Sequence, residues 1–215
     1  MAGHTHMTSL QSQFGQIDIY LFDQLLRGRI PPTARICDAG CGSGRNLVYL
    51  LRAGYDVRAV DADPSAIDIV RSMAASLAPG LPPDNFRAEP VERMSFPDRS
   101  VDFVISSAVL HFARDDGHFD AMLRECWRLL DGNGVFFCRL ASSIGIESRV
   151  RAVGSGRFLL PDGSERYLVT EARLTDLTER LGGDLIDPLK TTVVENQRSM
   201  TTWVMKKTVR APAVR

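Results

Sequence analysis

The sequence predicts an α/β protein: a Rossmann-like three-layer αβα sandwich around a mostly parallel seven-stranded sheet with an antiparallel last strand. Two observations lead to this fold class. Short apolar segments alternate with amphipathic segments of helical period along the 215 residues, which is typical of βαβ units with parallel strands. Near the C-terminal end, the polar turn Glu195-Asn196-Gln197 separates two apolar segments, and this closing hairpin leaves one strand antiparallel.

Strands are expected where short apolar runs are bounded by glycine, proline or polar turn residues. Five of them precede the hairpin, at residues 34–39, 56–60, 85–88, 101–106 and 134–140. The two hairpin strands are expected at about 187–194 and 200–206.

Helices are expected where apolar residues recur every three or four positions. The segments are 16–26, 43–52, 64–77, 116–130 and 170–181. Asp63 followed by Pro64 is a strong start signal, because aspartate accepts hydrogen bonds from the first turn and proline suits the first helical position. Thr170 can cap the last helix in the same way.

A single domain is expected over residues 1–215, since this length is usual for one domain. Residues 1–33 are expected to form an N-terminal tail and helix. Residues 142–169 show no long regular pattern, although Pro161-Asp162-Gly163 indicates a tight turn. Long connections of this kind are usually functional, so we interpret 142–169 as a substrate-side insertion or lid.

The composition argues against several classes of function. Lysine plus arginine equals aspartate plus glutamate at 26 each, so neither nucleic acid nor an anionic membrane is expected as a partner. No apolar run approaches the ~20 residues of a membrane span, and residues 1–13 lack the apolar core of a secretory signal, so the cytoplasm is the expected location. The four cysteines form no CxxC pair and have no histidine at zinc-ligand spacing, so no metal is expected.

The most informative stretch is the glycine-rich loop Asp38-Ala39-Gly40-Cys41-Gly42-Ser43-Gly44, between the first expected strand and its helix. Ligands of open α/β sheets bind at this carboxyl edge, and glycine lets the backbone turn close to a ligand. Asp38 can accept hydrogen bonds from an ammonium group. Asp61 ends the second expected strand, where a carboxylate can accept hydrogen bonds from both hydroxyls of a ribose.

The nearest alternative is a nicotinamide dinucleotide site, and with it an NAD(P)-dependent oxidoreductase. Its fingerprint is GxGxxG, in which the third glycine packs helix against strand and the pyrophosphate lies at the helix N-terminus. Here Arg45 takes the third-glycine position, and Asp38 brings a negative charge close to the phosphates. Both departures favour a ligand that has an amino group and no pyrophosphate, such as S-adenosylmethionine.

Further motifs follow the glycine loop: Val60-Asp61, then Phe96-Pro97-Asp98 with Val101-Asp102-Phe103-Val104, then Leu130-Asp131-Gly132-Asn133-Gly134. Together they resemble the successive motifs of class I S-adenosylmethionine-dependent methyltransferases, over about residues 36–140. A narrower resemblance, to the small tellurite-resistance-type branch, rests on residues 40–46 and on Ala53-Gly54-Tyr55-Asp56-Val57.

The resemblance implies an enzyme that transfers a methyl group from S-adenosyl-L-methionine to a small-molecule acceptor, with S-adenosyl-L-homocysteine as product. It implies that residues 38–42 hold the methionine part and Asp61 the ribose. An acidic residue after the third strand usually receives the adenine amino group; Pro90 is at that position here, so Glu89 or the backbone of Val91 takes the role. The expected cofactor-binding residues are Asp38, Ala39, Gly40, Cys41, Gly42, Gly44, Asp61, Ala62, Glu89, Val91 and Ser106.

The methyl acceptor is expected beyond the ends of the fourth and fifth strands. His111 can act there as a general base for a hydroxyl or amine, or it packs against the next helix. Arg139 lies late in an apolar strand, where its charge needs a partner, either an anionic acceptor or a structural ion pair. Arg45 serves an anion or is simply solvated. His111 and Arg139 are the candidate catalytic residues, and they support the hypothesis of a small, anionic acceptor.

A function of another class stays open at this point. A regulatory protein that keeps the cofactor pocket without turnover has the same motifs, because binding and turnover use the same loop. Bound cofactor that is never converted to S-adenosylhomocysteine, across a broad panel of acceptors, distinguishes it from an enzyme.

Overall fold

The computed structural model describes residues 9–208 and has the predicted Rossmann-like fold. Five parallel strands come first: β1 (Arg35–Ala39), β2 (Asp56–Asp61), β3 (Phe86–Ala88), β4 (Val101–Ser107) and β5 (Leu130–Ala141). The main sheet is completed by β9 (Gly183–Leu185), β10 (Lys190–Val194) and β11 (Arg198–Lys207). The strand order is β10-β11-β5-β4-β1-β2-β3, with β9 paired to β11.

The strand order reverses at β1, since the chain first moves outward to β3 and then returns to place β4 on the other side of β1. Such a switch point opens a crevice at the carboxyl ends of the strands. Strand β11 pairs antiparallel with β5, β10 and β9. The prediction of a mostly parallel sheet with an antiparallel last strand is therefore confirmed.

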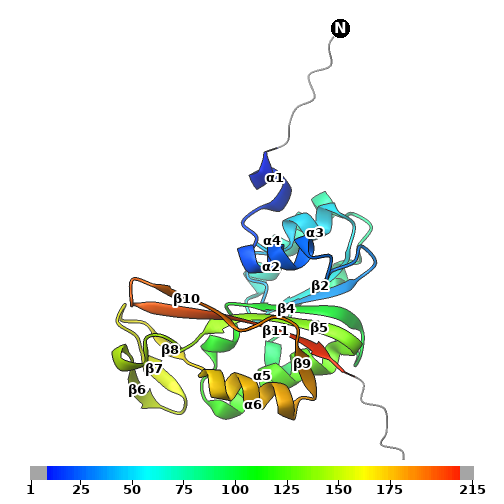
Figure 1. Cartoon of the computed structure of the whole chain (residues 1–215). Coiled ribbons are helices and arrows are strands. Elements are labelled where there is room, and N and C mark those ends of the chain that lie inside the picture. The colour runs from blue at the N-terminus through cyan, green and yellow to red at the C-terminus, as the bar shows by residue number, and fades with distance from the viewer. Residues whose placement is uncertain (1–8, 209–215) are drawn as a thin grey trace, which may run out of the picture.

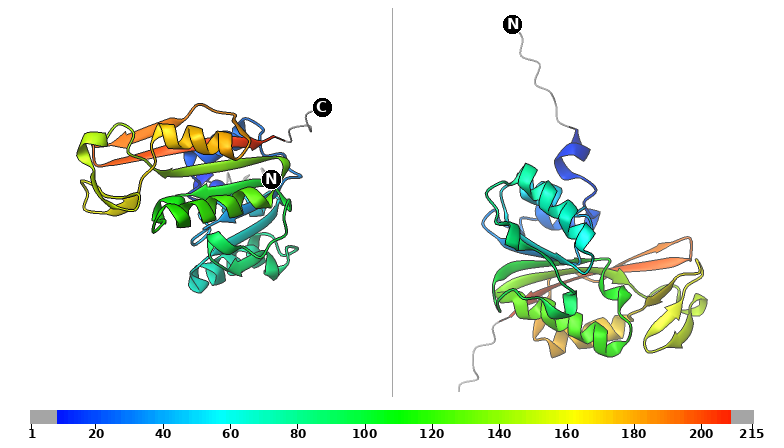
Figure 2. Two further views of the ribbon diagram at one scale, coloured as in Figure 1. Left: turned by 90° about the horizontal axis from the view of Figure 1, so that it is seen from below. Right: turned by 180° about the vertical axis from the view of Figure 1, so that it is seen from behind.

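Helices cover both faces of the sheet and form the outer layers (Figures 1 and 2). On one face lie α1 (Leu10–Phe14), α2 (Ile19–Leu26), α3 (Val48–Arg52) and α4 (Pro64–Leu77). On the other lie α5 (Asp116–Leu129) and α6 (Glu171–Arg180). The short 3-10 helices are η1 (Pro83–Asn85), η2 (Val91–Arg93), η3 (Leu110–Phe112) and η4 (Glu147–Arg149).

The two cores lie on opposite sides of the sheet because successive side chains of a strand point to opposite faces. In β5, Phe137 packs toward α2–α4, while its neighbours Phe136 and Cys138 pack toward α5 and α6. All three are fully buried. Burial of a large apolar side chain contributes roughly 1.5–3 kcal/mol, so this alternation stabilises both outer layers on one sheet.

The predicted helix starts are borne out by hydrogen bonds. Asp63 Oδ1 accepts a hydrogen bond from Ser65 N–H (2.9 Å) at the start of α4, and Thr170 Oγ1 accepts one from Arg173 N–H (3.1 Å) at the start of α6. Each cap satisfies a backbone donor that has no partner inside the helix.

Three predicted elements are corrected. The segment 16–26 is not one helix: α1 ends before Gly15, and α2 begins after its cap Asp18. Of the predicted helix 43–52, only Val48–Arg52 is α-helical, because residues 43–47 form turns at the end of the glycine loop. The strand expected at 187–194 begins at Lys190, since the Asp187 side chain binds to α2 and its neighbourhood instead.

Residues 142–169 contain a small second sheet made of β6 (Arg151–Gly154), β7 (Arg157–Leu159) and β8 (Glu165–Tyr167). The predicted turn at Pro161-Asp162-Gly163 joins β7 to β8, and Asp162 Oδ1 accepts the Ser164 N–H (2.9 Å). Arg157 Nη1 donates to the carbonyl of Ala113 (2.9 Å), and the Tyr167 hydroxyl bonds to Asp116. The small sheet is thereby attached to the segment from η3 to α5 (Figure 1).

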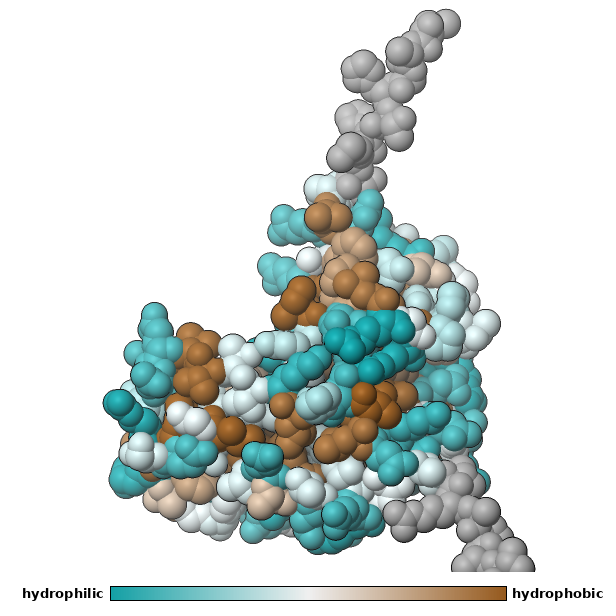
Figure 3. All heavy atoms as spheres, in the orientation of Figure 1, coloured by the Kyte–Doolittle hydropathy of each residue, from teal (hydrophilic) through white to brown (hydrophobic). Residues whose placement is uncertain are grey.

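The exposed large hydrophobic side chains lie mostly on short elements at the surface. Leu10, Ile19 and Leu26 belong to α1 and α2, and Val193 and Val194 belong to β10. Figure 3 shows hydrophobic surface over these parts of the molecule, separated by hydrophilic side chains. No helix within residues 9–208 has the length and apolar character that a membrane span needs.

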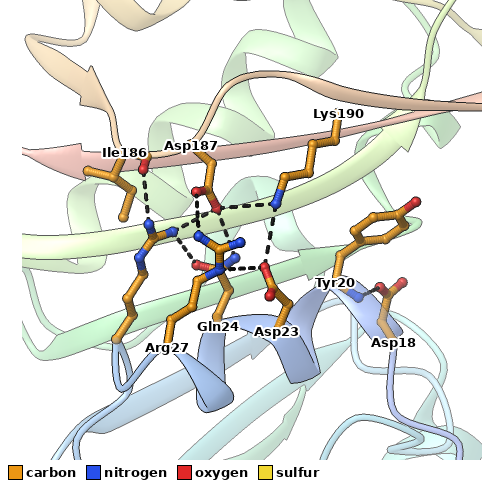
Figure 4. Close-up of polar contacts among 9 residues, drawn as sticks. Asp18, Tyr20, Asp23, Gln24, Arg27, Ile186, Asp187 and Lys190 are labelled. Atoms are coloured by element: carbon orange, nitrogen blue, oxygen red, sulfur yellow. Dashed lines mark hydrogen bonds and ion pairs between the residues drawn. The ribbon is translucent and has the colours of Figure 1, made fainter.

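A polar network attaches α2 to the connection between β9 and β10 (Figure 4). At its centre, Asp187 Oδ2 accepts hydrogen bonds from Arg29 Nη1 (2.7 Å) and Gln24 Nε2 (3.0 Å). Lys190 Nζ lies 3.4 Å from Asp23 Oδ2 and adds a second connection. Because Asp187 is buried, its charge depends on these donors rather than on water.

We expect Asp187→Ala to lower the free energy of unfolding by about 2 kcal/mol, because Arg29 and Gln24 lose their acceptor. The matched control is Asp176→Ala, which removes an exposed i,i+4 pair with Arg180 and should cost less than about 0.5 kcal/mol. Urea denaturation of the two variants and the wild type measures the difference. Equal losses in both variants would contradict a structural role for the network.

Candidate functional site

A cavity of about 670 Å³ opens at the carboxyl ends of β1, β2 and β4, at the switch point of the sheet. This volume is within the usual range of small-molecule sites. Its lining residues are Gly40, Cys41, Gly42, Ser43, Arg45, Asn46, Asp61, Ala62, Pro90, Val91, Glu92, Ser107, Ala108, Val109, Phe112, Arg114, His118 and Met122.

The glycine loop forms one wall of the cavity and follows the end of β2 closely. Gly40 N–H and Cys41 N–H both donate to the carbonyl of Val60 (2.9 and 3.0 Å). Gly40 has φ +83°, and a Cβ there would lie 2.6 Å from the Val109 side chain. Gly42 has φ +51°, and a Cβ there would project into open space. Glycine is therefore required at Gly40 by packing and at Gly42 by the backbone conformation.

Asp61, at the end of β2, accepts hydrogen bonds from the glycine loop and from the turn that precedes α4. Its Oδ2 accepts the Gly42 N–H (2.8 Å), and its Oδ1 accepts the Asp63 N–H (3.0 Å). A carboxylate oxygen has two lone pairs, so each oxygen can still accept a hydrogen bond from a ligand. The carboxylate is thus held in one orientation and lines the cavity.

Asp38 is almost completely buried beneath the same loop, with 1% of its surface exposed. Among the described residues, its Oδ2 has no hydrogen-bond partner. Burial raises the pKa of this carboxyl to about 7, with Arg45 acting against the shift and Asp61 adding to it. A buried acceptor without a partner fits a ligand that donates hydrogen bonds, such as an ammonium group.

Glu92 and His118 lie together at another part of the cavity. His118 Nε2 is 3.2 Å from Glu92 Oε1, while His118 Nδ1 accepts the Arg114 N–H (3.1 Å). Val91 and Met122 supply apolar surface beside them. This part of the cavity therefore offers apolar contacts and a carboxylate acceptor to a flat, polar ring of a ligand.

The candidate catalytic residue Arg139 has a protein partner. Its Nη1 donates to Asp18 Oδ2 (3.2 Å), which also accepts the Ser107 hydroxyl (3.1 Å). The sequence left open whether Arg139 meets an anionic acceptor or forms a structural ion pair. The ion pair, with Asp18, is present.

The candidate base His111 is buried beside the end of β5. Its Nδ1 accepts the Ala141 N–H (3.2 Å), so a neutral ring carries its proton on Nε2. Burial, together with the positive charges of Arg166 and Arg139, lowers the pKa of His111 to about 4. This geometry favours a hydrogen-bond donor or a structural side chain over a general base.

The expected cofactor residues separate into two groups. Gly40, Cys41, Gly42, Asp61, Ala62 and Val91 line the cavity, whereas Asp38, Ala39, Gly44, Glu89 and Ser106 do not. Asp38 lies beneath the loop, and Ser106 is fully buried in β4. The Glu89 carboxylate accepts hydrogen bonds from Ser95 N–H (2.8 Å) and Ser95 Oγ.

Sequence reasoning did not identify three residues of the site: Asp18, Glu92 and His118. Glu92 lies three residues after Glu89, in η2, and lines the cavity. His118 lies in the first turn of α5, three residues after the cap residue Asp115. This position after a capping residue is the signal by which the sequence could have identified it. Within residues 9–208 no group of three potential ligands could hold a metal ion, and the four cysteines are free and buried.

Comparison with known proteins gives the class. A family model described as a methyltransferase domain matches residues 37–138. An uncharacterized methyltransferase of Bacillus subtilis is 32% identical over 120 residues, which are 56% of this chain and 46% of that protein. A probable S-adenosylmethionine-dependent methyltransferase of Mycobacterium tuberculosis is 29% identical over 191 residues, 76% of this chain and 63% of its own length. The chain thus spans about half to three fifths of these relatives.

A solved structure agrees at the level of the fold. The 1,6-didemethyltoxoflavin N1-methyltransferase of Burkholderia thailandensis, with bound 1,6-didemethyltoxoflavin and S-adenosylhomocysteine, has a TM-score of 0.68 and 20% identity. The match covers 91% of this chain and 80% of that one. Residues 37–138 therefore match a methyltransferase domain, S-adenosylmethionine is the cofactor in the name of the Mycobacterium relative, and its product S-adenosylhomocysteine is bound in the Burkholderia structure.

We expect two buried groups of the site to give pH dependences of opposite sign. Below about pH 6.5 the unfolded His111 takes up a proton that the folded one takes up only near pH 4, so His111 makes stability fall as the pH falls. Asp38 keeps its proton up to about pH 7 in the folded state, whereas the unfolded carboxyl loses it near pH 4. Asp38 therefore makes stability fall as the pH rises from 4 to 7.

The measurement is urea denaturation of His111→Gln, Asp38→Asn and the wild type at pH 5 and pH 7. On going from pH 7 to pH 5, His111→Gln should lose less stability than the wild type, and Asp38→Asn should lose more. Parallel pH profiles for all three proteins would show that neither group titrates as inferred.

Proposed function

We propose that this protein transfers the methyl group of S-adenosylmethionine to a small-molecule acceptor. The observation that carries the proposal is the Asp38 carboxyl, buried at the end of β1 with an unpartnered oxygen beneath a glycine loop. The open space at Gly42 and the cavity of about 670 Å³ are suited to the same ligand. When bound, the cofactor would supply a methyl group on a sulfonium, and neutral S-adenosylhomocysteine would depart as the leaving group when the methyl–sulfur bond breaks.

Residues of the cavity, together with Asp38 beneath the glycine loop, would hold the cofactor. Asp38 accepts from the ammonium of the methionine part, and the nearby Arg45 guanidinium faces its carboxylate. Asp61 accepts from the ribose hydroxyls with the lone pairs that its backbone donors leave free. Glu92 replaces Glu89 as the acceptor for the adenine amino group, and Val91 contacts the ring.

Alignment and exclusion of water are the main contributions of the protein to this reaction. The apolar side chains Val109, Phe112 and Met122 line the cavity between its polar ends. They exclude water from the space in which the acceptor approaches the methyl group. Ser107 and Ala108, at the end of β4, lie on the side from which the acceptor enters.

The acceptor side is the less defined part of the proposal. The Burkholderia enzyme binds 1,6-didemethyltoxoflavin, which supports a small organic acceptor. Arginines near the cavity mouth support an anionic one, and the resemblance to the tellurite-resistance-type branch keeps a chalcogen oxyanion as a candidate. His111 and Arg139 remain the residues proposed to face it, His111 as a donor. The cytoplasm remains the proposed location.

Mass spectrometry on a metabolite extract, incubated with the protein and methyl-labelled S-adenosylmethionine, tests the proposed function. The expected result is a labelled small molecule formed in proportion to S-adenosylhomocysteine. Cofactor that binds but is not converted with any extract fraction would favour the regulatory protein instead.

We expect Gly42→Val and Asp61→Ala to weaken the binding of S-adenosylhomocysteine by at least about tenfold. Valine fills the space beside the loop, and alanine removes charge-assisted hydrogen bonds worth ~1.5–3 kcal/mol each. Matched controls are Gly54→Val and Asp68→Ala. Gly54 also has a positive φ but does not line the cavity, and Asp68 is an exposed residue of α4. Calorimetry that gives near-native affinity in both site variants would remove the proposed cofactor site.

We expect scrambling of residues 151–166 to lower acceptor turnover far more than cofactor affinity. The segment contains β6 and β7 and is attached near η3, on the acceptor side, while the proposed cofactor contacts lie between Asp38 and Glu92. Steady-state kinetics and calorimetry on the same variant separate the two effects. If affinity and turnover fall equally, residues 142–169 are not an acceptor lid but part of the cofactor site or of the fold.

A further inference from the structure

Asp18 lies directly before α2 and is almost completely buried beside the cavity mouth. Its Oδ2 accepts hydrogen bonds from Ser107 Oγ (3.1 Å) and Arg139 Nη1 (3.2 Å), and it is 3.6 Å from Arg45 Nη2. Arg45 and Ser107 line the cavity, and Arg45 Nη2 donates to Ser107 Oγ (2.9 Å). One carboxylate from the N-terminal segment therefore reaches side chains at the ends of β4 and β5.

A second arginine faces the same region from the small sheet. The Arg166 guanidinium carbon is 5.0 Å from the centroid of the Phe112 ring, and Phe112 is a cavity-lining residue with 56% of its surface exposed. The positive charges of Arg166 and Arg139 both lower the pKa of His111, so both guanidinium groups lie near this histidine.

The charges of this region do not cancel. Among residues 9–208, Asp18 is the carboxylate paired with Arg139 and, at 3.6 Å, with Arg45, whereas Arg166 forms no ion pair. The neutral His111 adds no charge near pH 7, because its pKa is lowered to about 4. With Arg45 assigned to the carboxylate of the cofactor under the proposed function, Arg139, Arg166 and Asp18 together leave one positive charge. In addition, Arg139 Nε is buried without a partner in the described part of the chain.

The position of Asp18 is fixed by the rest of α2. Asp18 N–H donates to Asn46 Oδ1 (3.0 Å), and Asp18 Oδ1 accepts from Tyr20 N–H (3.0 Å). Tyr20 hydrogen-bonds to Thr192 on β10 (2.6 Å), and its ring lies 5.4 Å from the Arg139 guanidinium carbon. Figure 4 shows Asp18 and Tyr20 at the start of the helix that Asp187 and Lys190 attach to the sheet.

We propose that Asp18 is a specificity-determining residue of the acceptor site, and that it sets the charge of the acceptor. With Arg45 assigned to the cofactor, Asp18 offsets one of the charges of Arg139 and Arg166, so the site suits a small molecule with a single negative charge next to the apolar Phe112. The inference rests on the proposed function, since it describes the acceptor of the same reaction. It adds the N-terminal segment to the acceptor site.

Benzoate and its neutral counterpart benzamide are suitable probes, because they differ mainly in charge. Each is titrated into wild type, Asp18→Asn and Arg139→Gln, with saturating S-adenosylhomocysteine and without it. The wild type should bind benzoate at least about fivefold more tightly than benzamide. Arg139→Gln should lose this preference, whereas Asp18→Asn should bind benzoate about fivefold more tightly than wild type, with benzamide unchanged.

The opposite signs separate a charge effect from structural damage, which would weaken binding in both variants. The exposed pair on α6 supplies matched controls: Asp176→Asn and Arg180→Gln should leave both affinities unchanged. The proposal is overturned if the wild type does not prefer benzoate, or if Asp18→Asn weakens benzoate binding as Arg139→Gln does. A wild type that fails to bind S-adenosylhomocysteine but shows both charge effects would instead contradict the proposed function alone.

Discussion

The hydrogen bond from Gly42 N–H to Asp61 Oδ2 is the contact on which the rest of the site depends. It joins the loop after β1 to the end of β2, two strands that are paired in register as far as Ala39 and Val60. The same loop directs Gly40 N–H and Cys41 N–H to the Val60 carbonyl, so three backbone donors fold it over the edge of the sheet. The loop therefore needs no ligand to adopt its shape, and the cavity beside it is largely preformed.

The charges around this contact differ between the two sides of the cavity. Asp61, and Asp38 once it loses its proton near pH 7, make the loop side acidic, which suits the ammonium and hydroxyl groups of a sulfonium nucleoside. A pyrophosphate would bring negative charge against both carboxylates at the place where a dinucleotide site offers a helix N-terminus. On the other side, arginines from β5 and from the small sheet outnumber their carboxylate partner. The proposed cationic donor and the proposed anionic acceptor would thus each meet side chains of opposite charge.

Local patterns in the sequence were enough to predict most of the fold. The alternation of apolar runs gave the strands, and Asp63-Pro64 gave the start of α4, because capping and periodicity involve residues close in the chain. The glycine loop and Asp61 were placed correctly for the same reason, since each ends its own strand.

Contacts between residues far apart in the sequence could not be predicted in this way. Asp18 and Arg139 are 121 positions apart, and no periodicity connects them. The choice between Glu89 and Glu92 depends on a 3-10 turn that directs Glu92 into the cavity while Ser95 binds Glu89. The strands of the small sheet in residues 142–169 have three or four residues each, which is too short for a clear alternation of apolar and polar side chains. We therefore interpreted this segment as an irregular insertion.

Thermal unfolding of the wild-type protein with S-adenosylhomocysteine and, separately, with NAD tests the central claim most directly. The claim is that a loop with two carboxylates beside it selects a sulfonium nucleoside over a dinucleotide. We expect S-adenosylhomocysteine to raise the unfolding temperature in a concentration-dependent way, as mass action requires for a ligand of the folded state, and NAD to have no effect. Stabilisation by NAD without stabilisation by S-adenosylhomocysteine would contradict the account.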